Sequence, residues 1–550
     1  MASRNLEREK LYSLFSLYEM EREAPDARDG LPELRQAAME RINRLRLASR
    51  SRTGRLEAVE FVDGNIVSML EDTLAQESDT GKIFDLVDGI KARTLLDQIR
   101  TRPPKVLSPA TARQVDALER EIMSFKPGAA GPDERRRALQ LASQLEISHP
   151  EHIDEVENLL ATSDAGFVEG ASAVSLADVS AALRAGEVLI EFCMPSRAMG
   201  SARLPLAIWA LVITQQSTRL VHLGRFPPPG SLESRVDVDG EAGVDFSPIT
   251  SLSSALSSAI RTGAGDMDER LNDAYELLIS PLLAAGLDPG VHRHWIIVPD
   301  AALHTVPFAA LRDADGQYLG VKVAMTIVPS ASVWHHQQQA VPQIAKFLGF
   351  GNPRVPGLQP LPFAEDEVRE VSRLLRNRGI DCKVFLDVDA TESRLKETIV
   401  GHHILHIAAH GAIATADAFD FHDLMLASTG ADDGRLHAHE LRTLDLRETS
   451  LAVLSVCDSG TYRFGAGNEL HGLMASLLIA GVHDVLGTLW PVNDALASRL
   501  IVRFYTYLLR HGAAEALRRA RADLIGQGAQ VVDWASFLVV GHGRGPAAAS

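Results

Sequence analysis

Two turns, each at the end of an apolar segment, carry residues suited to nucleophilic chemistry. His410 and Gly411 close the segment ILHIAAHG, and Cys457 lies 47 residues later, followed by Asp458 in LAVLSVCDSG. A cysteine thiol becomes a nucleophilic thiolate near neutral pH when a base such as an imidazole lies beside it. Glycine allows a substrate carbonyl to approach the backbone closely, so the amides of Gly411 and Cys457 are candidates for an oxyanion hole.

The region from 343 to 545 must position these turns. Short β-branched segments such as KFLGFG, CKVFLD, ILHIAAHG, LAVLSV and DVLGTLW alternate there with helical segments. This alternation is typical of a doubly wound, mostly parallel α/β sheet, in which functional groups gather at the carboxyl ends of strands. We therefore expect two neighbouring strands to deliver His410 and Cys457 to one edge of the sheet.

Two further units are expected before this region. Residues 165–335 contain the strand-like segments EVLIEFCM, LAIWALVIT, TRLVHLG and HWIIVPD, which indicate a second α/β unit. Residues 1–162 show apolar positions at three- and four-residue spacing, which predicts an all-α domain. Its helix lengths suit tetratricopeptide-like hairpins, although a clear 34-residue consensus is missing.

The motifs resemble those of the CHAT proteases, cysteine peptidases of the same broad clan as caspases and separases. The resemblance covers the region from about 165 to 543. It rests on LHIAAHG, LSVCDSG, ELHGLMASLLIAGVHDVLGTLWPVND and WASFLVVG, and further upstream on VPDAALHTVPFAALRDADGQYL, VPSASV and LPFAEDEVREV. The separation of His410 and Cys457 is also close to the roughly 50 residues found in caspases. The resemblance implies a caspase-like α/β fold, preceded by a pseudoprotease-like unit over 165–335.

The resemblance also assigns roles to individual residues. It makes Cys457 the nucleophile and His410 the general base. Asp458, a candidate substrate-binding residue, stands where the family commonly has Glu, which keeps the charge but shortens its reach. Separases have an acid in a loop similar to LWPVND, so Asp494 is the candidate floor of a pocket for a basic substrate residue. The alternative for Asp494 is a cap on the helix that follows it.

Other kinds of site fit the sequence less well. His406 and His410 have the spacing of helical metal ligands, but their segment is strand-like and no acids complete a site, so we expect no metal. His406 is expected to pack beneath the site. Cys193 and Cys382 are expected to be inert, buried thiols. His304 also follows a strand, but no cysteine lies at a suitable distance beyond it. The sequence contains neither a G-x-S-x-G nor a phosphate-loop motif.

Composition narrows the expected partners and location. The formal net charge is −17, so we do not expect nucleic acid as the default partner. Three scattered cysteines fit a reducing compartment, and neither a signal-like nor a membrane-spanning stretch is found, so a cytoplasmic protein without membrane contact is expected.

The expected function is that of an endopeptidase that needs no cofactor and cleaves a specific protein. Resemblance to prokaryotic CHAT proteins implies regulated proteolysis, including antiviral defence and gasdermin-type cell death. An activating protein partner is expected at the helical domain, and the segment from Ala412 to Leu436 is a candidate restraining loop. The alternative is a non-catalytic adaptor that binds a partner through the helical domain.

Overall fold

One mixed sheet organises most of the chain. The computed structural model describes residues 2–23, 31–48, 66–91, 174–199, 202–205, 207–225, 248–337, 344–413, 422–429, 432–442, 444–456, 472–492 and 494–544. Its strands are β1 (Glu187–Cys193), β2 (Ser196–Met199), β3 (Ala202–Pro205), β4 (Ala207–Ile213), β5 (Thr218–Arg225), β6 (His294–Val298), β7 (Ala324–Ile327), β8 (Lys346–Gly351), β9 (Asp381–Leu386), β10 (Ile404–Ile413), β11 (His422–Met425), β12 (Arg435–His437), β13 (Leu451–Val456), β14 (Asp484–Thr488) and β15 (Phe537–Gly541).

The helices flank this sheet or precede it in the chain. They are α1 (Ala2–Glu23), α2 (Leu31–Ala48), α4 (Val67–Gln76), α5 (Thr80–Gly89), α10 (Leu176–Ala182), α11 (Pro248–Thr262), α12 (Met267–Leu278), α13 (Ser280–Ala284), α14 (Leu319–Lys322), α15 (Ala331–His336), α16 (Pro362–Arg376), α17 (Glu392–Thr398), α18 (Ala438–Arg442), α19 (Leu473–Ala480), α20 (Asp494–Leu508) and α21 (Ala513–Gly526).

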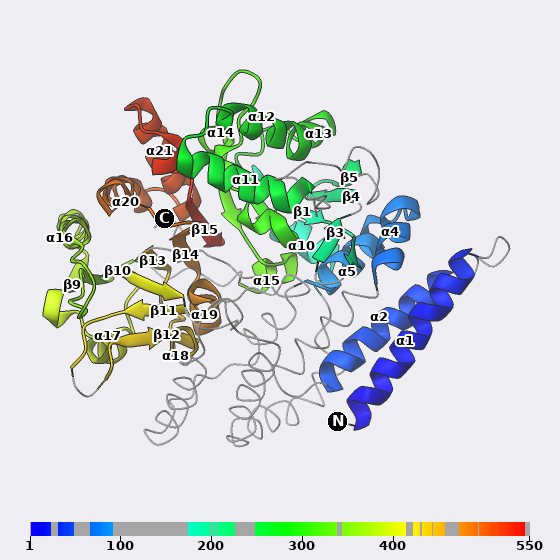
Figure 1. The fold of residues 1–550 in the computed structure, drawn as a ribbon, viewed down its shortest axis with the longest axis horizontal. Coiled ribbons are helices and arrows are strands. Elements are labelled where there is room, and N and C mark those ends of the chain that lie inside the picture. The colour runs from blue at the N-terminus through cyan, green and yellow to red at the C-terminus, as the bar shows by residue number, and fades with distance from the viewer. Residues whose placement is uncertain are drawn as a thin grey trace, which may run out of the picture.

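Thirteen of the described strands form the sheet, in the order β12-β11-β10-β13-β14-β15-β7-β6-β1-β4-β5, with β8 pairing to β10 and β9 to β8. Strands β9, β8, β10, β13 and β14 are parallel. Strand β15 is antiparallel to β14 and parallel to β7, which continues into parallel β6 and β1. The two groups of parallel strands therefore run in opposite directions and meet at β15 (Figure 1).

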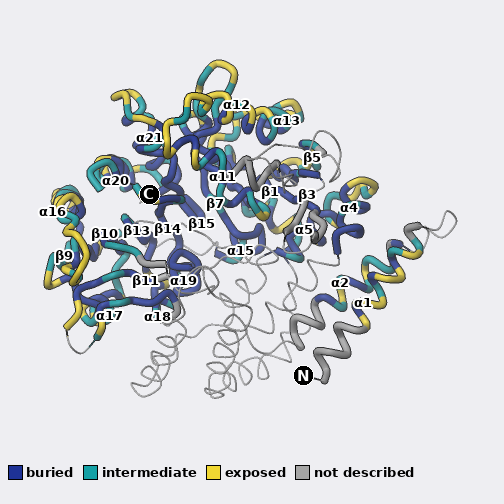
Figure 2. Tube along the Cα trace, viewed as in Figure 1, coloured by how far each residue is buried: buried dark blue, intermediate teal, exposed yellow. Residues whose placement is uncertain are grey.

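The sheet is buried because helices cover both of its faces (Figure 2). In the second half, alternate residues of the strands pack with α16, α20 and α21 on one face and with α18 and α19 on the other. In the first half, α11 and α12 pack on one face and α4, α5 and α15 on the other. Strands buried on both faces explain the nearly continuous apolar segments of the sequence. The α/β class predicted from the sequence is confirmed.

The N-terminal helices are joined to the sheet by buried polar contacts as well as apolar packing. Tyr18 on α1 donates a hydrogen bond to Asp72 on α4 at 3.1 Å. The Lys91 ammonium, just beyond α5, lies 3.5 Å from a Glu191 carboxylate oxygen on β1, and both side chains are almost completely buried. Because a buried charge is stabilised chiefly by its partner, this pair fixes α5 against β1.

The segment between His410 and the next core strand differs from the predicted variable loop. Strands β11 and β12 form a short antiparallel extension of the sheet, in which His422–Met425 pairs with the end of β10. The part of the proposed Ala412–Leu436 insertion that the structure describes is therefore largely β-structure. A local pattern is too short to indicate these strands, because each has only three or four residues.

Candidate functional site

The register of two parallel strands defines the candidate site. Ala409 on β10 pairs with Val456, the last residue of β13. His410 follows Ala409 and Cys457 follows Val456 in the chain. Cys457 and Asp458 lie outside the described residues. The two strands therefore lie side by side, as predicted, as far as Ala409 on β10 and Val456 on β13.

The alternation of side chains along β10 shows which face of the sheet His410 occupies. Ile404, His406 and Ala408 on β10 face α16 and α20, as do Leu451 and Val453 on β13. His410 continues the even-numbered series of β10, since successive side chains point to opposite faces of a strand.

The His410 imidazole is held by the loop between β8 and α16. Its Nε2 lies 2.7 Å from the backbone carbonyl oxygen of Gln359. A carbonyl oxygen only accepts hydrogen bonds, so Nε2 is the protonated nitrogen and Nδ1 of the neutral ring is the basic one. Sequence reasoning missed Gln359, and no sequence signal could have found it, because the contact uses a backbone atom.

Asp494 begins α20 and interacts with a different helix from the one that follows it in sequence. Its carboxylate accepts a hydrogen bond from the backbone N–H of Phe363, at the start of α16, at 3.1 Å. Burial raises the pKa of Asp494, and nearby Glu367 raises it further, whereas His410 and the amides of α16 lower it. Asp494 thus lies within the electrostatic influence of His410, and its role in substrate recognition stays a prediction.

A buried polar group lies beneath His410. His406 Nε2 is 2.8 Å from a Glu367 carboxylate oxygen, with both side chains fully buried. The Tyr505 ring stacks on the His406 imidazole with a centroid separation of 5.6 Å. His406 therefore packs below the site, as expected from the sequence. Glu367 was missed, although an acid on the apolar face of a helix was a visible signal.

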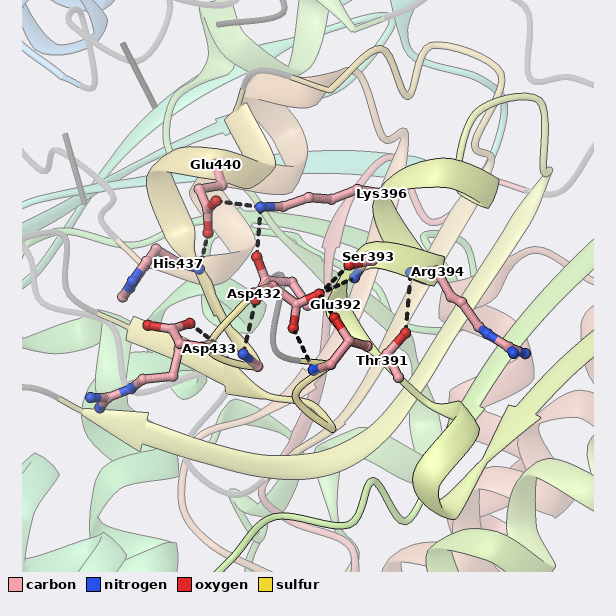
Figure 3. A network of polar contacts seen from close by, with 12 residues as sticks. Thr391, Glu392, Ser393, Arg394, Lys396, Asp432, Asp433, His437 and Glu440 are labelled. Atoms are coloured by element: carbon pink, nitrogen blue, oxygen red, sulfur yellow. Dashed lines mark hydrogen bonds and ion pairs between the residues drawn. The ribbon is translucent and has the colours of Figure 1, made fainter. Parts of the chain in front are cut away.

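A charged network ties α17 to α18 and to the two ends of β12 (Figure 3). The Lys396 ammonium bridges the carboxylates of Glu392 and Glu440, and Glu392 also accepts from the amide of Gly434 at 3.1 Å. Burial raises the pKa of Glu392 to about 7. Gly411 pairs with Leu424 on β11, and an oxyanion role for its amide stays a prediction.

The remaining residues singled out from the sequence lie away from His410. Cys193 is buried at the end of β1, and Cys382 is half-buried on β9. Burial raises the pKa of Cys382, which disfavours its thiolate. His304 is buried in the segment after β6. The described part of the chain contains no group of three or more His, Cys, Asp or Glu side chains arranged for a metal ion.

Together these features define an α/β protein with a candidate site at the ends of adjacent parallel strands. A family model described as the CHAT domain matches residues 268–542, which is half of the 550 residues. The chain belongs to the CHAT domain family. Within the described residues, no helix is long and apolar enough to cross a membrane.

Two curated relatives are similar to this chain. Tetratricopeptide repeat protein 28 is 24% identical in Homo sapiens and 25% identical in Mus musculus, over 356 residues in each case. Each match covers 53% of this chain and 14% of the relative, so the chain spans about a seventh of their length.

Two solved structures show a remote similarity. The Saccharomyces cerevisiae separase in complex with securin has a TM-score of 0.40 and 11% identity, covering 98% of this chain and 50% of that chain. The Arg-specific cysteine proteinase gingipain R has a TM-score of 0.34 and 10% identity, covering 50% of this chain and 67% of that chain.

Proposed function

We propose that the protein is a cysteine endopeptidase in which His410 activates Cys457. The observation that carries this proposal is the pairing of Ala409 with Val456 on parallel strands. These are the residues that immediately precede His410 and Cys457 in the chain. The family match supports the same chemistry. The arrangement suits acyl transfer because a nucleophile and its base must lie within hydrogen-bond reach.

The proposed reaction uses residues of this chain only. His410 Nδ1 takes the proton from the Cys457 thiol, and the thiolate attacks the scissile carbonyl carbon. Backbone amides of Gly411 and Cys457 stabilise the tetrahedral oxyanion. Its collapse breaks the C–N bond, and the imidazolium gives its proton to the leaving amine. Water then hydrolyses the thioester and restores the thiol. The Gln359 carbonyl holds Nε2–H throughout and so keeps Nδ1 directed to the reaction.

The substrate side of the proposal rests on Asp494 and Asp458. The partly buried carboxylate of Asp494 accepts from the neutral amide of Phe363. It favours a basic side chain before the scissile bond, because such a side chain adds the opposite charge that an amide does not supply. We assign the reaction to regulated cleavage of a specific protein in a prokaryotic cytoplasm, as in antiviral defence or gasdermin-type cell death. A protein partner at the N-terminal helices would relieve the restraint on the enzyme.

The test is cleavage of fluorogenic peptides with Arg, Lys, Asp or Leu before the reporter. We expect wild type to cleave the basic peptides and Cys457→Ala and His410→Ala to lose at least about 10³-fold in kcat/KM. Cys382→Ala is the matched control and should retain activity, since Cys382 lies two strands away from β10. Equal activity of wild type and Cys457→Ala would contradict the mechanism.

The alternative function is a non-catalytic adaptor that binds a partner through its helical region. Similarity to a protein named for its tetratricopeptide repeats is compatible with this alternative. Timed labelling with iodoacetamide, followed by mass spectrometry of each cysteine peptide, distinguishes the two. An activated Cys457 should react at least about tenfold faster than Cys193 or Cys382. Equal rates at the three positions would favour the adaptor.

A further inference from the structure

A pocket with one buried cation lies where the two groups of parallel strands meet. Its empty space is about 410 Å³, a figure that includes the solvent at its open side. It is lined by side chains from β7, β15, α21 and the segments after β6 and β14, among them His304, Phe308, Met325, Leu489, Arg521 and Phe537. Neither the candidate nucleophile nor its base is needed to form it.

The pocket differs from an apolar cavity because the charged side chain of Arg521 lines it. Its side chain is only 3% exposed, and one terminal nitrogen donates to the backbone carbonyl of Phe537. Its Nε is buried and has no hydrogen-bond partner among the described residues. Arg518 and Arg519, on the same helix, both bind the carboxylate of Glu515, whereas no described acid pairs with Arg521.

An unpaired buried guanidinium is costly unless something compensates its charge. Burial lowers the pKa of Arg521 to about 9, so the group still carries its charge at neutral pH. Among the described residues that line the pocket, Arg521 and His304 have polar side chains and the others have apolar ones. The pocket therefore offers one positive charge and one imidazole between apolar walls.

We propose that this pocket binds a carboxylate carried on a short apolar body, with the carboxylate on Arg521 and the apolar part against Phe308, Met325 and Phe537. A single guanidinium matches the single charge and planar shape of a carboxylate, whereas a phosphate dianion would need further donors. Two sources share this chemistry: a free small carboxylic acid and the C-terminal residue of a peptide. His304, which the proposed peptidase mechanism does not use, finds a role here beside the anion.

The test measures thermal unfolding of the full chain with hexanoate or with N-acetyl-leucine, at constant sodium concentration balanced with chloride. Hexanamide and N-acetyl-leucinamide are the neutral controls on the ligand side. We expect at least one carboxylate to raise the Tm of wild type more than its amide does. A response to hexanoate alone identifies a free acid as the source, and a response to N-acetyl-leucine alone identifies a peptide terminus.

Two substitutions on α21 provide the protein-side controls. Arg521→Met should weaken the apparent affinity for the carboxylate at least about tenfold, since it removes the charge and keeps the volume, while Arg519→Met should behave as wild type. If Arg521→Met fails to fold, titration calorimetry of wild type with hexanoate, hexanamide and the N-acetyl-leucine pair decides the matter. Equal effects of acid and amide, or of wild type and Arg521→Met, would overturn the proposal. Neither readout depends on peptidase activity.

Discussion

Glu367 on α16 and His406 on β10 form a hydrogen bond of 2.8 Å in which neither side chain reaches solvent. His406 lies four residues before His410 and on the same face of β10. This contact therefore fixes α16 against the strand that carries the candidate base. The loop that holds His410 through Gln359 leads directly into α16. A buried polar pair thus supports the geometry of the site from below.

We expect Glu367→Ala to lower the free energy of unfolding by about 2–4 kcal/mol, because it leaves the buried His406 ring without its partner and opens a cavity. Glu367→Gln keeps an acceptor of nearly the same size and should cost about half as much. Urea denaturation measures both. Asp366→Ala, at the neighbouring exposed position, is the control and should stay within about 0.5 kcal/mol of wild type. A Glu367→Ala protein as stable as this control would refute the structural role.

Asp494 allows its two roles to be separated. Asp494→Ala should cost about 1 kcal/mol through loss of the acceptor for the Phe363 N–H, while Asp494→Asn retains an acceptor and should cost less. If Asp494 also recognises a basic substrate residue, both variants should lower the ratio of kcat/KM for Arg over Leu peptides. The combination of denaturation and peptide kinetics checks this. If Asp494→Asn left the ratio of kcat/KM for Arg over Leu peptides unchanged, Asp494 would act only as the cap of α16.

Lys396 on α17 pairs with Glu440 on α18, and Glu440 also accepts a hydrogen bond from the amide of His437 at the end of β12. Removal of Lys396 should therefore loosen the β11–β12 extension. Lys396→Met leaves the carboxylates of Glu392 and Glu440 facing each other without a cation. We expect a loss of about 1–2 kcal/mol, modest because the lysine side chain is 36% exposed. Hydrogen exchange at Leu424, Leu426 and Gly434 should accelerate. Arg447→Met, at an exposed ion pair, is the control, and similar exchange rates in the two variants would argue against the network.

Asp484 should make stability depend on pH. Burial raises its pKa from 3.8 to about 7, although the amides of Gly543 and His542 and the charge of Arg544 oppose this. Between these two values the unfolded chain loses the proton that the folded chain keeps. The stabilisation from Asp484 is therefore complete below about pH 4 and declines as pH rises to about 7.

Asp484→Asn removes this titration while preserving an acceptor for Gly543. Its stability relative to wild type should improve as pH rises from about 4 to 7, by up to about 1.4 kcal/mol per pH unit, and should level off above that range. Denaturant unfolding at several pH values measures the difference. Parallel curves for the two proteins across this range would show that Asp484 does not titrate as described.

Local pattern in the sequence indicated most of the sheet. The segments KFLGFG, ILHIAAHG, LAVLSV and DVLGTLW are the strands β8, β10, β13 and β14. The turn predicted at His410 and Gly411 is wrong, because β10 continues through both residues to Ile413 and pairs there with β11. Apolar period and β-branched composition are properties of neighbouring residues, so they can be read without the fold. The short strands β11 and β12 escaped this reading, since they carry too few residues for a pattern.

The sequence by itself determined the alternation of strands and helices and membership of the CHAT family through its motifs. Only the tertiary structure decided that Gln359 holds His410, that Glu367 pairs with His406, that Asp494 caps α16, and that Arg521 faces a pocket without a described acid. These contacts join residues far apart in the chain. Their geometry follows from packing of whole layers, which no local period encodes.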